Sequence, residues 1–179
     1  MEDKLRLLEL YLKTPDQALF LDIETEGLSK EKNGITLIGL YLRGQYRAFI
    51  QGIDLEKALE YLTTTPIWIT FGGENFDIPF IKKTFHEGVT PLVHLDLYHL
   101  SRLIGLRGGL KEIERTLGLR RQTEGLNGYD AVKLWRKWKE NGDYYALQRL
   151  IQYNQEDVVN LEVILNYIIR KLFGEAVNT

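Results

Sequence analysis

The chain has 179 residues, with 23 Lys and Arg against 25 Asp and Glu, a formal net charge of -2 and no cysteine. This length favours a single domain over residues 1–179, and apolar (44 %) and charged (27 %) shares of this size exclude a disordered chain. The lack of cysteine excludes disulfides, thiolate zinc sites and cysteine nucleophiles. No apolar run approaches the roughly 18 residues that span a bilayer, and the charged amino terminus is unlike a secretory signal. We therefore expect a cytoplasmic protein with no membrane contact.

The first half of the chain alternates short apolar runs with helical patterns. Leucines at helical spacing predict a helix over residues 3–13, which ends at Thr14-Pro15. Apolar runs of strand length predict strands at 18–23, 35–42, 45–50, 66–70 and 92–95. Between these runs, helices are predicted from a cap at Asp54 to about residue 63, and over 75–85. Because a hairpin precedes the strand–helix alternation, we expect an α/β fold with a mixed sheet flanked by helices.

After residue 96 the pattern is wholly helical and locally basic. Helices are predicted over 97–104, 109–117 and 129–139, followed by a long helical stretch from 143 to about 173. Within this half, residues 101–140 carry 10 basic and 5 acidic side chains, a net charge of +5. Such a segment can hold a polyanion such as nucleic acid, although a solvated helical surface gives the same composition.

Two carboxylates close the first apolar run. Asp22 and Glu24 are two residues apart, so on a strand they project from the same side. Carboxylates placed side by side repel unless a cation neutralises them, and the hard cations Mg²⁺ and Mn²⁺ prefer oxygen ligands. The alternative is an exposed strand end followed by an acidic turn.

Two further carboxylates occupy predicted helices. Asp77 lies in the first turn of the helix over 75–85, where a carboxylate can also serve as an ordinary cap. Tyr153 and Asp157 are four residues apart among apolar neighbours, so on one helix they share a largely buried face. A buried Asp needs a charge, a donor or a metal as partner, and a hydrogen bond with the Tyr is the alternative.

Three motifs in this order resemble those of a known family. They are Asp22-Ile-Glu-Thr-Glu-Gly-Leu28 (D-x-E-T-x-G-L), Phe76-Asp-Ile-Pro-Phe80 and Tyr153-Asn-Gln-Glu-Asp157 (Y-x-x-x-D). Together they resemble the DEDD (DnaQ-like) superfamily of 3′–5′ exonucleases in its tyrosine branch. His94-Leu-Asp-Leu97 looks like the H-x-D-L element of YprB-type predicted exonucleases. The resemblance runs from about residue 18 to 170, and leaves the amino-terminal helix (residues 1–14) outside the family core.

The resemblance implies a ribonuclease H-like fold, in which a three-strand antiparallel start is followed by parallel strands and an all-helical second half. It also implies a metal-dependent 3′–5′ exonuclease that acts on single-stranded DNA or RNA ends with two divalent ions, Mg²⁺ or Mn²⁺. Asp22, Glu24 and Asp157 would hold one ion. Asp22 would also bind the second, which Asp77 would help to hold through water. Tyr153 would orient or deprotonate the attacking water, and orientation is favoured because an unperturbed phenol, with a pKa of about 10, is a poor base.

The resemblance further implies contacts with the terminal nucleotide, from Thr25, Gly27, Leu28 and Phe76; for Phe76, packing in the core is the alternative. One position departs from the family: Gly72 stands where relatives carry an Asn that grips the substrate. Asp96 is expected to cap a helix, with a role near the site as the alternative. Two other functions remain open at this point, a catalytically idle nucleic-acid-binding module and an endonuclease that uses the same site.

Overall fold

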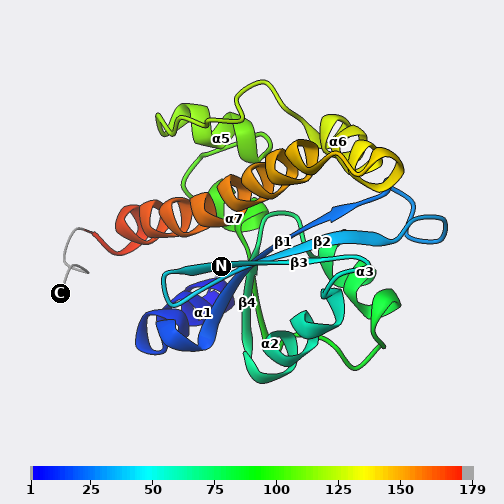
Figure 1. Ribbon diagram of the computed structural model, residues 1–179. Coiled ribbons are helices and arrows are strands. Elements are labelled where there is room, and N and C mark those ends of the chain that lie inside the picture. Colours follow the sequence, from blue (N-terminus) through cyan, green and yellow to red (C-terminus); the bar gives the residue numbers. More distant parts are fainter. Residues whose placement is uncertain (1, 175–179) are drawn as a thin grey trace.

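A five-stranded mixed sheet forms the centre of the protein in a computed structural model that describes residues 2–174 (Figure 1). The strands lie in the order β3-β2-β1-β4-β5, with bounds β1 Ala18–Thr25, β2 Ile35–Leu42, β3 Gln45–Ile50, β4 Ile67–Thr70 and β5 Val93–Asp96. Strands β1, β2 and β3 pair antiparallel, whereas β4 and β5 run parallel to β1. This arrangement confirms the expected mixed sheet. The domain predicted over 1–179 includes residues 1 and 175–179, which lie outside the described residues.

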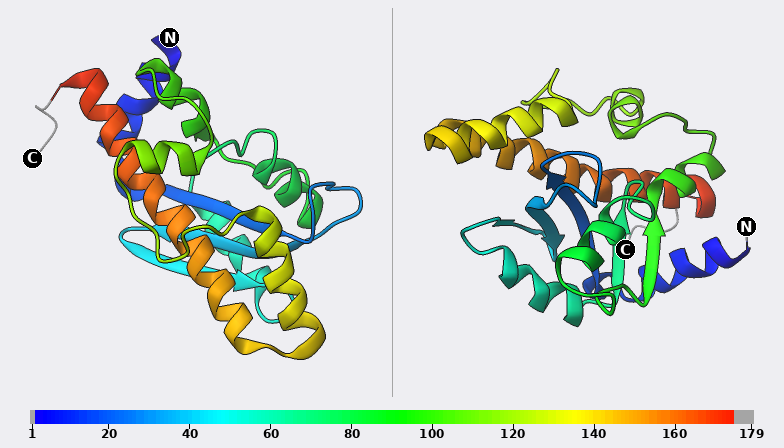
Figure 2. Two further views of the ribbon diagram at one scale, coloured as in Figure 1. Left: turned by 90° about the horizontal axis from the view of Figure 1, so that it is seen from above. Right: turned by 90° about the vertical axis from the view of Figure 1, so that its right-hand side faces the viewer.

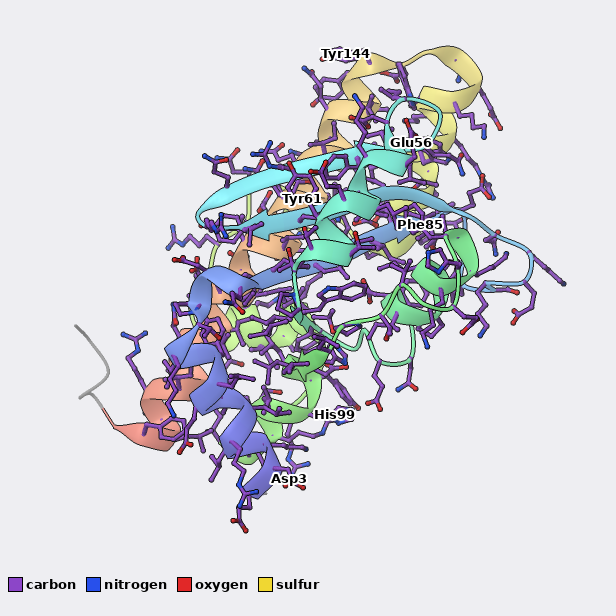
Figure 3. All side chains as sticks on the ribbon, turned by 90° about the horizontal axis from the view of Figure 1, so that it is seen from below. Asp3, Glu56, Tyr61, Phe85, His99 and Tyr144 are labelled. Atoms are coloured by element: carbon purple, nitrogen blue, oxygen red, sulfur yellow. The ribbon has the colours of Figure 1, made fainter. Side chains whose placement is uncertain are left out.

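Helices cover both faces of the sheet. Their bounds are α1 Glu2–Lys13, α2 Ala58–Thr64, α3 Asp77–Thr84, α4 Leu97–Leu103, α5 Leu110–Thr116, α6 Gly128–Asn141 and α7 Tyr144–Phe173. From residue 97 to residue 174 the regular elements are all helices, as predicted, and α7 crosses one face of the sheet, with α6 packed antiparallel beside it (Figure 2). Helices α2 and α3 cover the opposite face (Figure 3). None of the helices in residues 2–174 combines the length and apolar character of a membrane span.

The alternation of side chains along β1 divides the core between the two faces. Leu19, Leu21 and Ile23 pack on the face covered by α2 and α3. Phe20 points to the other face, into a cluster that includes residues of α7, α4 and α1. Asp22 and Glu24 follow Phe20 at intervals of two, so they share its face and lie under α7. The strand thus delivers both carboxylates to the same side of the sheet.

Local turns refine three sequence-based expectations. Asp54 does not cap α2, because its Oδ1 accepts a hydrogen bond from Ile50 N at 2.9 Å and a 3₁₀ turn over Leu55–Lys57 intervenes before the helix. Asp96 does cap α4, accepting from Tyr98 N at 3.0 Å. Gly72 has a φ of +76°, a left-handed conformation that glycine adopts without the strain imposed by a Cβ atom.

Candidate active site

Three carboxylates from two elements meet under α7. Asp22 and Glu24 of β1 and Asp157 of α7 each offer an oxygen, and these oxygens lie within 4.8 Å of one another. Glu24 and Asp157 are buried, and Asp22 is half-buried. The sheet alone provides two of these groups, and the packing of α7 across β1 provides the third.

Asp77 approaches β1 from the other side. Strand β4 pairs with β1 only as far as Phe20, which leaves the backbone N–H of Ile23 without a strand partner on that edge. The side chain of Asp77, the first residue of α3, takes this position and its Oδ1 accepts from Ile23 N at 3.1 Å. Asp77 is therefore buried beside the strand residues that carry the other carboxylates, but it does not belong to the group within 4.8 Å.

Tyr153 lies one helical turn before Asp157 and shares its environment. Lys111 Nζ donates a hydrogen bond to Tyr153 Oη at 2.9 Å and lies 3.5 Å from Asp157 Oδ1. Burial, followed by the negative charge of Asp157, raises the pKa of Tyr153 above its ordinary value. The phenol therefore stays protonated, and its own O–H remains available as a donor.

A second cation, Arg121, also reaches Asp157. Its Nη1 lies 2.5 Å from Asp157 Oδ1 and 2.9 Å from Glu114 Oε1, and its Nη2 donates to the backbone oxygen of Tyr153 at 3.1 Å. Glu114 in turn accepts from Asn160 Nδ2 at 2.9 Å. Because the side chains of both Arg121 and Glu114 are buried, this network fixes the Asp157 carboxylate in place and partly neutralises it.

Asn154 connects α7 to the strand carboxylates. Its Nδ2 donates to Asp22 Oδ2 at 3.1 Å and to the backbone oxygen of Asp22 at 3.2 Å, and its Oδ1 accepts from Tyr46 Oη at 2.7 Å. Gly39 of β2, paired with Asp22, makes this approach possible, since a Cβ there would lie 1.7 Å from Asn154 Oδ1.

Sequence patterns did not single out four residues of this site, Lys111, Arg121, Glu114 and Asn154. A glycine inside a strand indicates a close approach by another group, so Gly39 is the one signal that points toward Asn154. Lys111 and Arg121 belong to the cationic segment of residues 101–140. The sequence alone allows this segment to be either a nucleic-acid-binding surface or a solvated helical surface. No periodicity in that segment distinguishes a lysine or arginine that enters the site from one that remains on the surface.

A cavity of about 590 Å³ opens next to the carboxylates. It is lined by Asp22, Glu24, Tyr153 and Asp157, and by all four residues expected to contact substrate, namely Thr25, Gly27, Leu28 and Phe76. Leu28 is 88 % exposed, whereas Phe76 packs against Phe80 with ring centroids 4.9 Å apart. Thr25 Oγ1 donates to the Gly27 oxygen at 2.8 Å and so holds the turn that carries Leu28.

The histidines lie outside this group of carboxylates. His94 Nε2 is 2.8 Å from Thr70 Oγ1, and His99 Nε2 is 3.2 Å from Glu74 Oε2. Asp96, near both histidines, accepts from Gly72 N at 2.7 Å and from Glu74 N at 3.2 Å as well as capping α4. Its oxygens are thus occupied by backbone donors that shape the turn before α3.

Burial raises the pKa values of all four carboxyl groups, and neighbouring carboxylates raise those of Asp22, Glu24 and Asp77 further. Burial, followed by the charge of Asp157, raises the pKa of Glu24 to about 8, and burial raises the pKa of Asp77 to about 7. The pKa of Asp22 is raised by burial and by the charges of Asp157, Glu24 and Asp77. Burial also raises the pKa of Asp157, although Lys111 and Arg121 oppose this.

These carboxylates fit hard divalent cations. Their oxygens converge from different elements, and the three carboxylates face two basic side chains, Lys111 and Arg121, of which Arg121 also pairs with Glu114. Mg²⁺ and Mn²⁺ prefer such oxygen ligands and would supply the missing charge. The donor set therefore suits a divalent ion held by Asp22, Glu24 and Asp157.

Without metal, the protein is expected to lose stability as the pH rises. A carboxyl whose pKa is raised on folding binds more protons in the native than in the unfolded state, so stability falls as pH passes from the ordinary value toward the raised one. For Glu24 this interval runs from 4.5 to about 8. Thermal unfolding in the presence of a chelator should show a midpoint several degrees lower at about pH 8 than at about pH 5.

Added Mn²⁺ should recover most of this loss at the higher pH, because bound metal stabilises the ionised carboxylates. The double variant Asp22→Asn/Glu24→Gln is the control and should show a flatter pH dependence. A parent midpoint that stays constant or rises over this interval in chelator would contradict the assignment of these pKa shifts.

Comparisons with known proteins identify the fold. A family model described as the RNase H superfamily matches residues 19–169. The structure is similar to that of the family B DNA polymerase from the hyperthermophilic archaeon Pyrobaculum calidifontis, with a TM-score of 0.61 and 15 % identity over 89 % of this chain and 26 % of that chain. It is also similar to a structure titled "apo form of the nuclease", with a TM-score of 0.59 and 20 % identity over 98 % of this chain and 78 % of that one.

No curated protein matches the sequence. The chain spans about a quarter of the polymerase chain, and at these identities both structural similarities concern the fold. The match to the family model, in contrast, covers most of the sequence and includes β1, α3 and α7, the elements that carry the carboxylates. The chain belongs to the RNase H superfamily.

Proposed function

We propose that this protein is a metal-dependent 3′–5′ exonuclease that hydrolyses phosphodiester bonds at single-stranded DNA or RNA ends by a two-metal-ion mechanism. The observation that carries the proposal is the convergence of Asp22, Glu24 and Asp157 within 4.8 Å beside an open cavity. The order of the three sequence motifs and Tyr153 at four residues before Asp157 support the tyrosine branch of the DEDD superfamily, and the His94–Leu97 element supports a YprB-type member.

Each residue has a defined part in this proposal. Two bound Mg²⁺ or Mn²⁺ ions would activate a water and stabilise the attacking and leaving oxygens of the phosphoryl transfer. Asp22, Glu24 and Asp157 would supply carboxylate ligands, and Asp77 would help to hold the second ion. Arg121 and Asn154 keep Asp157 and Asp22 in position through the hydrogen bonds described above.

Tyr153 orients the water rather than deprotonating it. Its hydroxyl accepts a hydrogen bond from Lys111 and has a raised pKa, so it acts as a donor to a water or phosphate oxygen. The exposed Leu28, together with Thr25, Gly27 and Phe76, lines the cavity where the terminal nucleotide would lie. The side chain of Asn33 packs so closely against Gly27 that a Cβ atom there would lie 2.8 Å from Asn33 Nδ2, and this contact fixes the turn.

The Tyr153→Phe variant is expected to lower turnover by roughly ten- to a hundredfold, because it removes one positioned donor while leaving every carboxylate in place. The affinity for Mn²⁺, measured by isothermal titration calorimetry, should stay within about twofold of the parent. Tyr145→Phe, an exposed hydroxyl at the start of α7, is the control. Equal turnover for the Tyr153→Phe variant and the parent would show that this hydroxyl is idle.

Incubation with a 5′-labelled single-stranded oligonucleotide tests the proposed activity. With Mn²⁺ we expect a ladder of progressively shorter labelled products, and none with EDTA. An oligonucleotide blocked at its 3′ hydroxyl should resist degradation, and paired DNA and RNA substrates of one sequence identify the preferred sugar.

A covalently closed single-stranded circle separates the alternatives. Cleavage of the circle would favour an endonuclease with the same site. The absence of products from linear and circular substrates under both Mg²⁺ and Mn²⁺, together with retained oligonucleotide binding, would favour an idle nucleic-acid-binding module. Either result would overturn the exonuclease proposal.

A further inference from the structure

A second cavity continues from the catalytic one along α6. It has a volume of about 250 Å³ and is lined by Glu26, Asn33, Val132, Trp135, Arg136, Lys139 and Glu140. Three of these residues, Glu26, Val132 and Arg136, also line the cavity that holds the carboxylates. The two cavities are therefore neighbours, and together they form a continuous depression between α6 and the turn after β1.

One face of α6 forms a wall of this depression. Tyr129, Val132, Arg136 and Lys139 recur at intervals of three and four residues, the spacing of a single helical face. Trp135 provides the packing beneath, since it is buried in the cluster that joins α6 to α7 and β2. At a rise of about 1.5 Å per residue, this face extends for about 15 Å from Tyr129 to Lys139.

The basic side chains on this face of α6 are engaged less closely by carboxylates than the two basic side chains at the active site. Lys111 and Arg121 are committed to Asp157, Tyr153 and Glu114. Within residues 2–174, by contrast, no acidic side chain lies within ion-pairing distance of the exposed guanidinium of Arg136. The side chain of Lys139 is 58 % exposed; its Nζ donates to Gln51 Oε1 at 3.2 Å and lies 3.9 Å from Glu26 Oε1. The guanidinium of Arg136 is thus available to an external anion, and the ammonium of Lys139 can reach one by exchanging these two contacts.

We infer that Arg136 and Lys139 bind the backbone phosphates of a single nucleic-acid strand, upstream of the nucleotide that occupies the catalytic cavity. An exposed guanidinium and an exposed ammonium line a path that begins at the carboxylates, and both groups suit phosphate oxygens, although Glu26 and Glu140 line the same second cavity. The inference rests on the proposed function, since it takes the reacting end of the strand to lie at Asp22, Glu24 and Asp157.

The length of the path gives the inference a further consequence. In a single strand whose reacting end lies at the carboxylates, the phosphates available to Arg136 and Lys139 are those upstream of the scissile phosphate, along the roughly 15 Å of this face. A dinucleotide ends before it reaches Lys139, whereas a strand of eight or more residues covers the whole path. The contribution of the two cations should therefore appear only with the longer substrates.

The double variant Arg136→Gln/Lys139→Gln tests the inference by fluorescence anisotropy with a labelled twelve-nucleotide strand and Ca²⁺ as the divalent ion. We expect roughly tenfold weaker binding and a slope of log Kd against log salt that is smaller by about 1.4, since each phosphate neutralised in a single strand contributes about 0.7. The control is Lys133→Gln/Lys137→Gln, which removes the same charge from α6 but changes residues that line neither cavity. This control should change binding less than twofold.

Hydrolysis of the p-nitrophenyl ester of thymidine 5′-monophosphate separates this inference from the proposed function, because that substrate has no upstream phosphate. The Lys133→Gln/Lys137→Gln control should match the parent on this ester and on the long strand, and the Arg136→Gln/Lys139→Gln variant should show a rise in KM on the long strand that exceeds any change on the ester. Equal losses of strand binding in the two double variants, or a matching loss with a dinucleotide, would overturn the inference. Arg136-dependent strand binding without any hydrolysis would keep Arg136 and Lys139 as strand-binding residues but refute the exonuclease proposal.

Discussion

Cleavage by the Asp22→Ala variant is expected to fall by at least on the order of a thousandfold, because this side chain lies in the carboxylate group and serves both proposed ions. The fold should be retained, since the Asn154 amide keeps the Asp22 backbone oxygen, at 3.2 Å, as an acceptor. Removing one of several crowded carboxylates also relieves repulsion. Initial rates on a 5′-labelled strand with Mn²⁺, together with the thermal midpoint in chelator, measure both effects.

The control for this experiment is Asp16→Ala, which removes an exposed carboxylate six residues earlier in the chain. It should retain full activity. Asp157→Ala is a less informative variant, because Asp157 is also the partner of Arg121 and Lys111 and its removal changes the packing under α7. Substantial cleavage by the Asp22→Ala variant would place the chemistry elsewhere and refute the assignment of this site.

The Arg121→Ala variant is expected to lower the free energy of unfolding by about 3–5 kcal/mol, the cost of breaking a buried ion pair by removing one partner. The side chain of Arg121 is 3 % exposed and lies between Glu114 and Asp157, so its loss leaves two buried carboxylates without their guanidinium. Urea unfolding in chelator measures this change. Mn²⁺ should restore part of the lost stability, because a bound ion can replace the missing charge at Asp157.

Arg115→Ala is the control for Arg121, since the side chain of Arg115 is 62 % exposed and lies 3.8 Å from the equally exposed Glu124. An exposed pair of this kind contributes about 0–1 kcal/mol, so the variant should unfold almost like the parent. Similar losses for the two variants would mean that the buried network adds no more than a surface pair. Arg121 would then have no special part in holding α5 and α7 together.

Local patterns were sufficient to predict most elements of the fold. Apolar runs of strand length predicted β1 to β5, and the leucines of residues 3–13 predicted α1. Capping was less predictable: Asp96 caps α4, whereas Asp54 hydrogen-bonds to the backbone of Ile50 instead. An Asp before a helix has several nearby backbone donors, and the final path of the turn decides which one it meets.

The sequence by itself determined the spacing of Asp22 and Glu24 on one side of a strand and of Tyr153 and Asp157 on one side of a helix. Both are consequences of the fixed repeat of a single element. Only the tertiary structure decided that these pairs meet, that Asp77 takes the free N–H of Ile23, and that Lys111 and Arg121 turn inward while Arg136 stays unpaired among the described residues. The physical reason is that contacts between residues 22 and 157, or 121 and 157, depend on how α7 packs across the sheet, and no local repeat encodes that packing.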